Sequence, residues 1–135
     1  MRKILVLALA AALSGCATMT ALFHSPPPVY VVFFPDRSTD LPKAGQKIAD
    51  DAAAAAKLDG AKTVQLTGPS TKIAPGYDPS LAEPRIHAVE LALIADGVAQ
   101  NRLVRASETT DGVNVKSDPS GAQRVEIRLV ERPAN

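Results

Sequence analysis

The sequence predicts a two-layer α+β sandwich, in which two helices cover one face of a small sheet. Three observations predict it. Residues 29–34 are β-branched or aromatic throughout, residues 124–130 alternate polar and apolar side chains, and two segments with helical spacing lie between them. The predicted order is β-α-β-α-β, with room for one more short strand. Because strand–helix–strand crossovers are right-handed, both helices are expected on the same face.

The length, the charge and the cysteine count of the chain exclude several classes of function. The chain has 135 residues, with 15 Lys and Arg, 14 Asp and Glu, and one cysteine. That length holds one domain. Nucleic-acid binders usually carry a basic excess, so no nucleic-acid partner is expected. A single cysteine excludes an intrachain disulfide and a cysteine-based zinc site, and no cofactor is indicated.

Residues 1–15 are predicted to be a signal peptide. A basic start, Arg2 and Lys3, precedes the uncharged residues 4–13. This stretch is shorter than the roughly 20 apolar residues that a membrane-spanning helix needs.

The segment Leu13-Ser14-Gly15-Cys16 resembles the bacterial lipobox. The resemblance implies that Cys16 carries acyl chains such as palmitate and becomes the mature N-terminus. Two or three chains anchor a protein stably. Ala17 stands where the inner-membrane retention signal has aspartate, so the resemblance implies the periplasmic face of the outer membrane. The alternative is an ordinary signal peptide followed by a buried free cysteine.

Residues 16–28 are expected to form a tether, because Pro26-Pro27-Pro28 favours an extended polyproline conformation.

Residues 29–34 are expected to form the first strand. Their continuous apolar run is typical of an interior strand that is buried on both faces, and Pro35 closes it.

The first helix is expected to begin near Asp40 and to continue to Leu58, because Pro42 suits a first helical turn. Its predicted inner face is Ala44, Ile48, Ala52 and Ala55. Residues 61–66 then alternate as a half-buried strand, with Val64 and Leu66 on one face.

Residues 67–79 are rich in Gly and Pro and are expected to form a loop. A second helix follows and ends at Gly97. Residues 102–105 are expected to form a short strand, and residues 106–122 a loop in which 113–115 could add another. The predicted inner faces are Ile86, Val89 and Leu93 in the helix and Val125, Ile127 and Leu129 in the last strand.

Four segments resemble OmpA-like peptidoglycan-associated domains, over residues 29–130. Residues 64–68 (VQLTG) resemble the strand that leads into that family's Gly-His-Thr-Asp loop. Residues 78–85 (DPSLAEPR) resemble its Asn-x-x-Leu-Ser-x-x-Arg segment. Ala88-Val89, Leu93, Gly97-Val98 and Arg102-Leu103 match its helix and the turn after that helix, and residues 124–127 match its terminal strand. The resemblance implies a small mixed sheet, and leaves residues 131–135 as a tail.

The family binds the diaminopimelate of the peptidoglycan stem peptide. By resemblance, Arg85 holds the ligand carboxylate, as a guanidinium fork can. Asp78 stands in place of the family's Asn. Gly68 begins the ligand loop, and either Ser70 or Thr71 occupies the position of the family's aspartate.

Two departures lie within this site. Residues 68–71 (GPST) lack the loop aspartate, and Pro84 stands beside Arg85. A proline in a helix removes one backbone donor, so the helix begins late with Glu83 as its cap, or kinks. Ser80 and Glu83 also spell a capping box, which competes with the late start.

Other interpretations stay open for single residues. Arg85 is either a ligand contact or a surface cation paired with Glu83 or Asp78. Asp78 is expected first to cap the helix, and Tyr77 to anchor the loop rather than to line the pocket. His87 is expected to be structural or solvated.

No catalytic motif links the Ser, His and Asp residues, so an enzyme is not expected. Two functions remain. The first is an outer-membrane lipoprotein that binds peptidoglycan non-covalently and tethers the membrane to the cell wall. The second is a domain whose ligand site has decayed and which binds other proteins of an envelope assembly.

Overall fold

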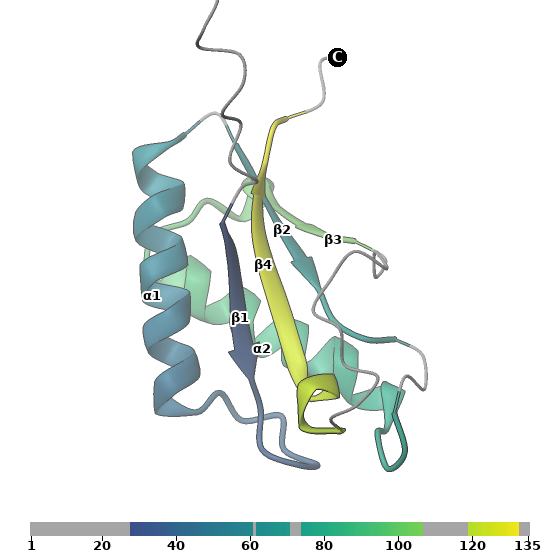
Figure 1. The fold of residues 1–135 in the computed structure, drawn as a ribbon. Helices are drawn as coiled ribbons and strands as arrows, with labels where there is room; N and C mark the ends of the chain where they lie inside the picture. The colour runs from purple at the N-terminus through teal and green to yellow at the C-terminus, as the bar shows by residue number, and fades with distance from the viewer. Residues whose placement is uncertain (1–27, 61, 71–73, 107–118, 133–135) are drawn as a thin grey trace, which may run out of the picture.

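A computed structural model describes residues 28–60, 62–70, 74–106 and 119–132. Figure 1 shows two layers, with both helices on one face of the sheet, as the sequence predicts. The main elements are β1 (Val29–Phe33), α1 (Lys43–Leu58), β2 (Thr63–Thr67), α2 (Ala82–Ala95), β3 (Leu103–Arg105) and β4 (Arg124–Val130). Single 3-10 turns are η1 (Pro79–Leu81), η2 (Gln100–Arg102) and η3 (Pro119–Ala122).

The sheet is mixed and has the strand order β1-β4-β2-β3. Strand β4 is antiparallel to both of its neighbours, and β3 is parallel to β2. The C-terminal strand β4 is therefore interior.

The prediction that residues 29–34 form an interior strand was wrong, because β1 lies at one edge of the described sheet. Val32 and Phe34 are buried on the helix side, whereas Phe33 is 51% exposed and Val29 37% exposed. A continuous apolar run is typical of a strand buried on both faces. In β1, apolar side chains also occupy the face of the sheet that no helix covers.

One hydrophobic core lies between the sheet and the helices. The inward positions alternate as predicted in β2 and β4, and α2 buries the three predicted positions. These core residues are Val64, Leu66, Val125, Ile127, Leu129, Ile86, Val89 and Leu93. Because both helices contribute to this single core, they lie on the same face of the sheet.

The inner face of α1 differs from the predicted one. Only Ala52 of the four predicted residues is fully buried; Ala44 is exposed. The buried set is Gly45, Ala49, Ala52, Ala53 and Ala56. An alanine-rich segment has few large side chains to mark one stripe. At Gly45 the backbone of α1 packs directly against β1, since an added Cβ would lie only 2.8 Å from Cγ1 of Val32.

Both helices begin differently from the prediction. Helix α1 begins at Lys43, with Pro42 rather than Asp40 before it. At α2, Asp78 caps the preceding turn η1 by accepting from the Ser80 backbone N–H at 3.0 Å. This confirms the cap and replaces both the Glu83 cap and the capping box. Pro84 lies in the first turn of α2, where N–H groups have no acceptor within the α-helix.

The predicted signal peptide, Cys16 and the tether up to residue 27 lie outside the described residues, as do residues 113–115. Within the described ranges, no helix is long and apolar enough to cross a membrane.

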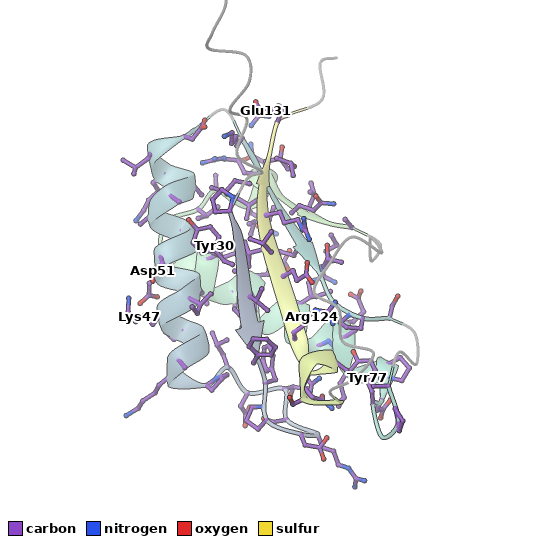
Figure 2. The ribbon with its side chains drawn as sticks, viewed as in Figure 1. Tyr30, Lys47, Asp51, Tyr77, Arg124 and Glu131 are labelled. Carbon is purple, nitrogen blue, oxygen red and sulfur yellow. The ribbon has the colours of Figure 1, made fainter. Side chains whose placement is uncertain are left out.

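The face of the sheet opposite the helices holds buried charges. Arg124, Glu126 and Arg128 point to this face, as the alternation predicts, yet Arg124 is only 3% exposed and Glu126 only 4%. Arg124 Nε and Arg128 NH2 each donate to Glu126 at 2.9 Å. Burial alone would raise the pKa of Glu126, but the hydrogen bonds from both arginines hold it below its usual value. Figure 2 labels Arg124 on β4.

Candidate functional site

Arg85 joins helix α2 to the turn that follows β1. The side chain is 0% exposed. Its Nε donates to the Ser38 carbonyl at 2.8 Å and its NH2 to the Pro35 carbonyl at 3.2 Å. The guanidinium carbon lies 5.3 Å from the centre of the Phe34 ring, which supplies a cation–π contact. Neither Glu83 nor Asp78 forms an ion pair with it in the described part of the chain.

The third guanidinium nitrogen, NH1 of Arg85, is buried and has no hydrogen-bond partner among the described residues. A buried donor without an acceptor costs about 1–3 kcal/mol. Burial lowers the pKa of Arg85, and nearby Tyr77, Asp36 and Asp78 act in the opposite direction. A guanidinium remains charged in proteins, so NH1 is a buried cationic donor, and the Tyr77 side chain lies close to the guanidinium group.

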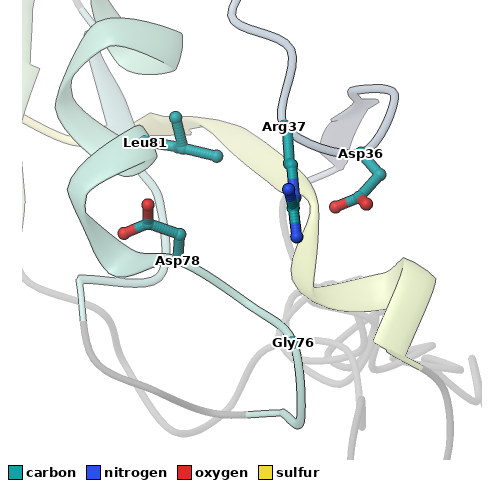
Figure 3. Close-up of a pocket in the computed structure, with 5 residues that line it drawn as sticks. All are labelled: Asp36, Arg37, Gly76, Asp78 and Leu81. Atoms are coloured by element: carbon teal, nitrogen blue, oxygen red, sulfur yellow. The ribbon is translucent and has the colours of Figure 1, made fainter.

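A pocket of about 260 Å³ lies between the turn after β1 and the start of η1, and Arg85 is close to it but does not line it. Figure 3 shows the residues that line it: Asp36, Arg37, Gly76, Asp78 and Leu81. The sequence segments that form the two sides are far apart in the chain. Arg85 connects them, because it lies on α2 directly after η1 and holds the turn formed by residues 35–38.

The pocket carries charges of both signs. In the view of Figure 3, the Arg37 guanidinium lies between the carboxylates of Asp36 and Asp78. Hydrogen bonds from the Ser80 hydroxyl and backbone lower the pKa of Asp78, and the positive charges of Arg37 and Arg85 add to the effect. Asp78 is therefore ionised at neutral pH while it caps the turn. Such a pocket suits a small zwitterionic group.

Of the predicted loop residues that the structure describes, neither Gly68 nor Ser70 lines the pocket. Gly68 is buried against Ile86, where an added Cβ would come within 3.3 Å of Ile86 Cδ1. The Tyr77 hydroxyl donates to the Pro69 carbonyl, which confirms its expected role as an anchor of the loop. Ser70 is exposed, and Thr71 lies outside the described residues.

Sequence reasoning missed Asp36 and Arg37. The only signal was that polar residues follow the end of a strong strand, at a Pro-Asp turn. The geometry of the turn was not readable, because Arg37 has a φ of 55°, in the left-handed region that favours glycine.

His87, the histidine within the described residues, lies on the surface. The His87 side chain is 58% exposed and its Nδ1 lies 3.4 Å from Glu90. Glu90 and Glu83 both pair with Arg105, at 2.7 and 2.6 Å. Within residues 28–60, 62–70, 74–106 and 119–132, no three His, Cys, Asp or Glu side chains are placed to hold a metal ion.

No family model matches the chain, and no curated protein matches it. Solved structures do match. For each of the three below, the two percentages after the TM-score are the shares of this chain and of that chain that align.

The OmpA-like domain of FopA1 from Francisella tularensis has 22% identity and a TM-score of 0.60, over 78% of this chain and 75% of that one. The peptidoglycan-associated lipoprotein from Burkholderia pseudomallei has 21% identity and a TM-score of 0.55, over 76% and 90%. The periplasmic domain of Helicobacter pylori MotB has 20% identity and a TM-score of 0.56, over 76% and 71%. At these identities the similarity is one of fold.

Proposed function

Since the chain has the OmpA-like fold, we propose that its domain binds the peptide stem of peptidoglycan in the pocket beside Arg85. The observation that carries the proposal is the buried Arg85, which holds the turn on one side of a pocket that contains two carboxylates. We further propose that residues 29–130 form this domain, that residues 1–15 are removed, and that acylated Cys16 and the tether hold it at the outer membrane, on its periplasmic face.

The charges of the pocket match those of diaminopimelate, whose free end carries a carboxylate and an ammonium group. Arg85 NH1 supplies a charge-assisted hydrogen bond to the carboxylate. Asp36 and Asp78 supply negative charge for the ammonium group. Ser70 or Thr71 offers only a neutral hydroxyl where the family has an acid, and Gly68 keeps the loop close to α2. We therefore expect weak binding.

Restoring the loop acid is expected to strengthen binding. The substitution Thr71→Asp adds a negative charge for the ligand ammonium, and a charge-assisted hydrogen bond contributes about 1.5–3 kcal/mol. The measurement is co-sedimentation with purified diaminopimelate-type sacculi, using the chain without its signal peptide and with Cys16→Ser. The matched control is Asn101→Asp, which adds the same charge at an exposed position in η2 that does not line the pocket.

The same experiment separates the two candidate functions. If the wild-type chain sediments with sacculi and Thr71→Asp sediments more, the peptidoglycan proposal stands. If neither chain sediments, the better explanation is a decayed ligand site on a domain that binds other envelope proteins.

Acylation at Cys16 is a separate expectation of the proposal. Mass spectrometry of the mature N-terminus should detect an acylated cysteine, and the Cys16→Ser chain should leave the membrane fraction. A mature N-terminus at another residue, or a Cys16→Ser chain that still partitions into membranes, would exclude the lipid anchor.

A further inference from the structure

We propose that Arg37 is a second cationic contact for the ligand carboxylate, held over the pocket in a strained turn that Arg85 fixes. This inference rests on the proposed function and adds a specificity-determining residue to its site.

Arg37 is the cation that faces the pocket. It is exposed and lines the cavity, and its side chain makes no hydrogen bond or ion pair with another described residue. Arg85 is fully buried, and two of its nitrogens already donate to main-chain carbonyls. Of the two guanidinium groups, only that of Arg37 can present two parallel donors to one carboxylate.

The backbone at Arg37 is strained. The Ser38 N–H donates to the Pro35 carbonyl at 3.1 Å, which closes a four-residue turn with Arg37 in its third position. A φ of 55° at this position favours glycine over any residue with a Cβ. Strained residues persist where the surrounding structure determines their conformation, and they cluster at functional sites.

Arg85 supplies that surrounding structure. It donates to the carbonyls of Pro35 and Ser38, the first and last residues of the turn. The two hydrogen bonds fix both ends of the turn against α2, so Arg37 is carried in a defined place at the pocket rim. In this respect Arg85 is a positioning residue for Arg37 in addition to offering its own NH1.

The acidic residues define what the pocket accepts. Asp36 and Asp78 flank Arg37 in Figure 3 without pairing with it, so the guanidinium is available to a ligand. A ligand with a free carboxylate next to an ammonium group satisfies both signs of charge. The same ligand with its carboxylate converted to a carboxamide loses the ionic contact with Arg37.

The test uses Arg37→Gly in the chain without its signal peptide and with Cys16→Ser. The probes are the stem tripeptide that ends in meso-diaminopimelate and the same tripeptide with the side-chain carboxylate of diaminopimelate amidated. Calorimetry should show wild-type preference for the free acid. Arg37→Gly should weaken binding of the free acid by about tenfold to a hundredfold, and leave the amide nearly unchanged. Because glycine relieves the strained φ, the same substitution should raise the melting temperature.

Two further variants complete the design. Arg37→Lys keeps a charge and should recover part of the preference. Lys47→Gln removes an exposed cation from α1 and should leave binding unchanged.

Each outcome is decisive. If the wild type prefers the free acid and Arg37→Gly retains that preference, the inference is wrong while the proposed function stands. If Arg37→Gly lowers the melting temperature together with the affinity, Arg37 serves the fold and the inference is again wrong. If the wild type binds neither tripeptide nor sacculi, the proposed function fails, and the inference fails with it.

Discussion

Glu126→Gln is expected to lower the free energy of unfolding by about 3–5 kcal/mol, the usual cost of removing one partner from a buried ionic network. Glu126 lies on the interior strand β4, and its two oxygens accept from Arg124 and Arg128 at 2.9 Å. Without the carboxylate, two neighbouring cations face each other, and one of them is almost fully buried. Urea unfolding followed by circular dichroism measures the change.

The matched control is Glu131→Gln, whose side chain is 82% exposed and lies 3.6 Å from Lys62. An exposed pair of this kind contributes about 0–1 kcal/mol, so the control should unfold close to the wild type. If Glu126→Gln and Glu131→Gln lower the free energy of unfolding by the same small amount, the buried ionic network does not stabilise the fold as expected.

The dependence on pH follows from the same contacts. The arginines hold the pKa of Glu126 below its usual 4.5, so the folded state binds its proton less readily than the unfolded state. The stabilisation is therefore complete above pH 4.5 and is lost as the pH falls through the lower pKa of the folded state. The difference in stability between wild type and Glu126→Gln should shrink over that acidic range.

Arg85→Ala is expected to abolish binding to sacculi and to destabilise the domain. Each hydrogen bond to a charged group contributes about 1.5–3 kcal/mol, and this substitution removes the bonds to Pro35 and Ser38. The partial relief of a buried charge offsets some of the loss. Binding disappears because NH1 is gone and because the turn that carries Arg37 is released. Sedimentation and thermal unfolding measure the two effects.

A second bracing arginine provides the control. Arg102 donates to the carbonyls of Lys62 and Asp59, at the turn between α1 and β2. Arg102→Ala should destabilise the domain to a similar degree and leave binding intact below its melting temperature. If Arg85→Ala binds as well as the wild type, the proposed site is wrong. If Arg102→Ala also loses binding, instability alone explains the loss.

The sequence predicted those parts of the fold in which large apolar side chains recur at a regular period. In β4, Val125, Ile127 and Leu129 define one face, and in α2 Ile86 and Leu93 define the inner stripe. The inner face of α1 was predicted only in part, because alanines surround the helix on all sides: Ala52 is buried, and Ile48 and Ala55 pack against the core, whereas Ala44 is exposed. The order of the strands was also wrong for β1, since pairing depends on contacts with residues almost a hundred positions away.

The site was predictable only in part. Asp78 could be predicted as a cap from its own neighbours, and Arg85 was assigned by resemblance, whereas its bonds to Pro35 and Ser38 join segments about fifty residues apart. The conformation of Arg37 is a property of the closed turn and has no signature in the sequence. The burial of Glu126 was unexpected, because alternation predicts the direction of a side chain and not what covers it.

The start of β1 and the pocket lie at opposite ends of the sheet, and this arrangement determines how the domain would bear a pulling force. Val29, the first residue of β1, is paired with Arg128 near the end of β4, and Glu131 lies at that same end of the sheet in Figure 2, whereas Tyr77 and the pocket lie at the other end. If Cys16 is anchored and the pocket is occupied, tension enters at Val29 and leaves through Arg85 and the turn at the far end of β1. The pull then runs along β1, across hydrogen bonds that are perpendicular to it. The covalent backbone of β1 carries this load from Val29 to the turn, so the hydrogen bonds between β1 and β4 are not peeled apart one at a time, and the bonds from Arg85 to Pro35 and Ser38 are the noncovalent contacts under load.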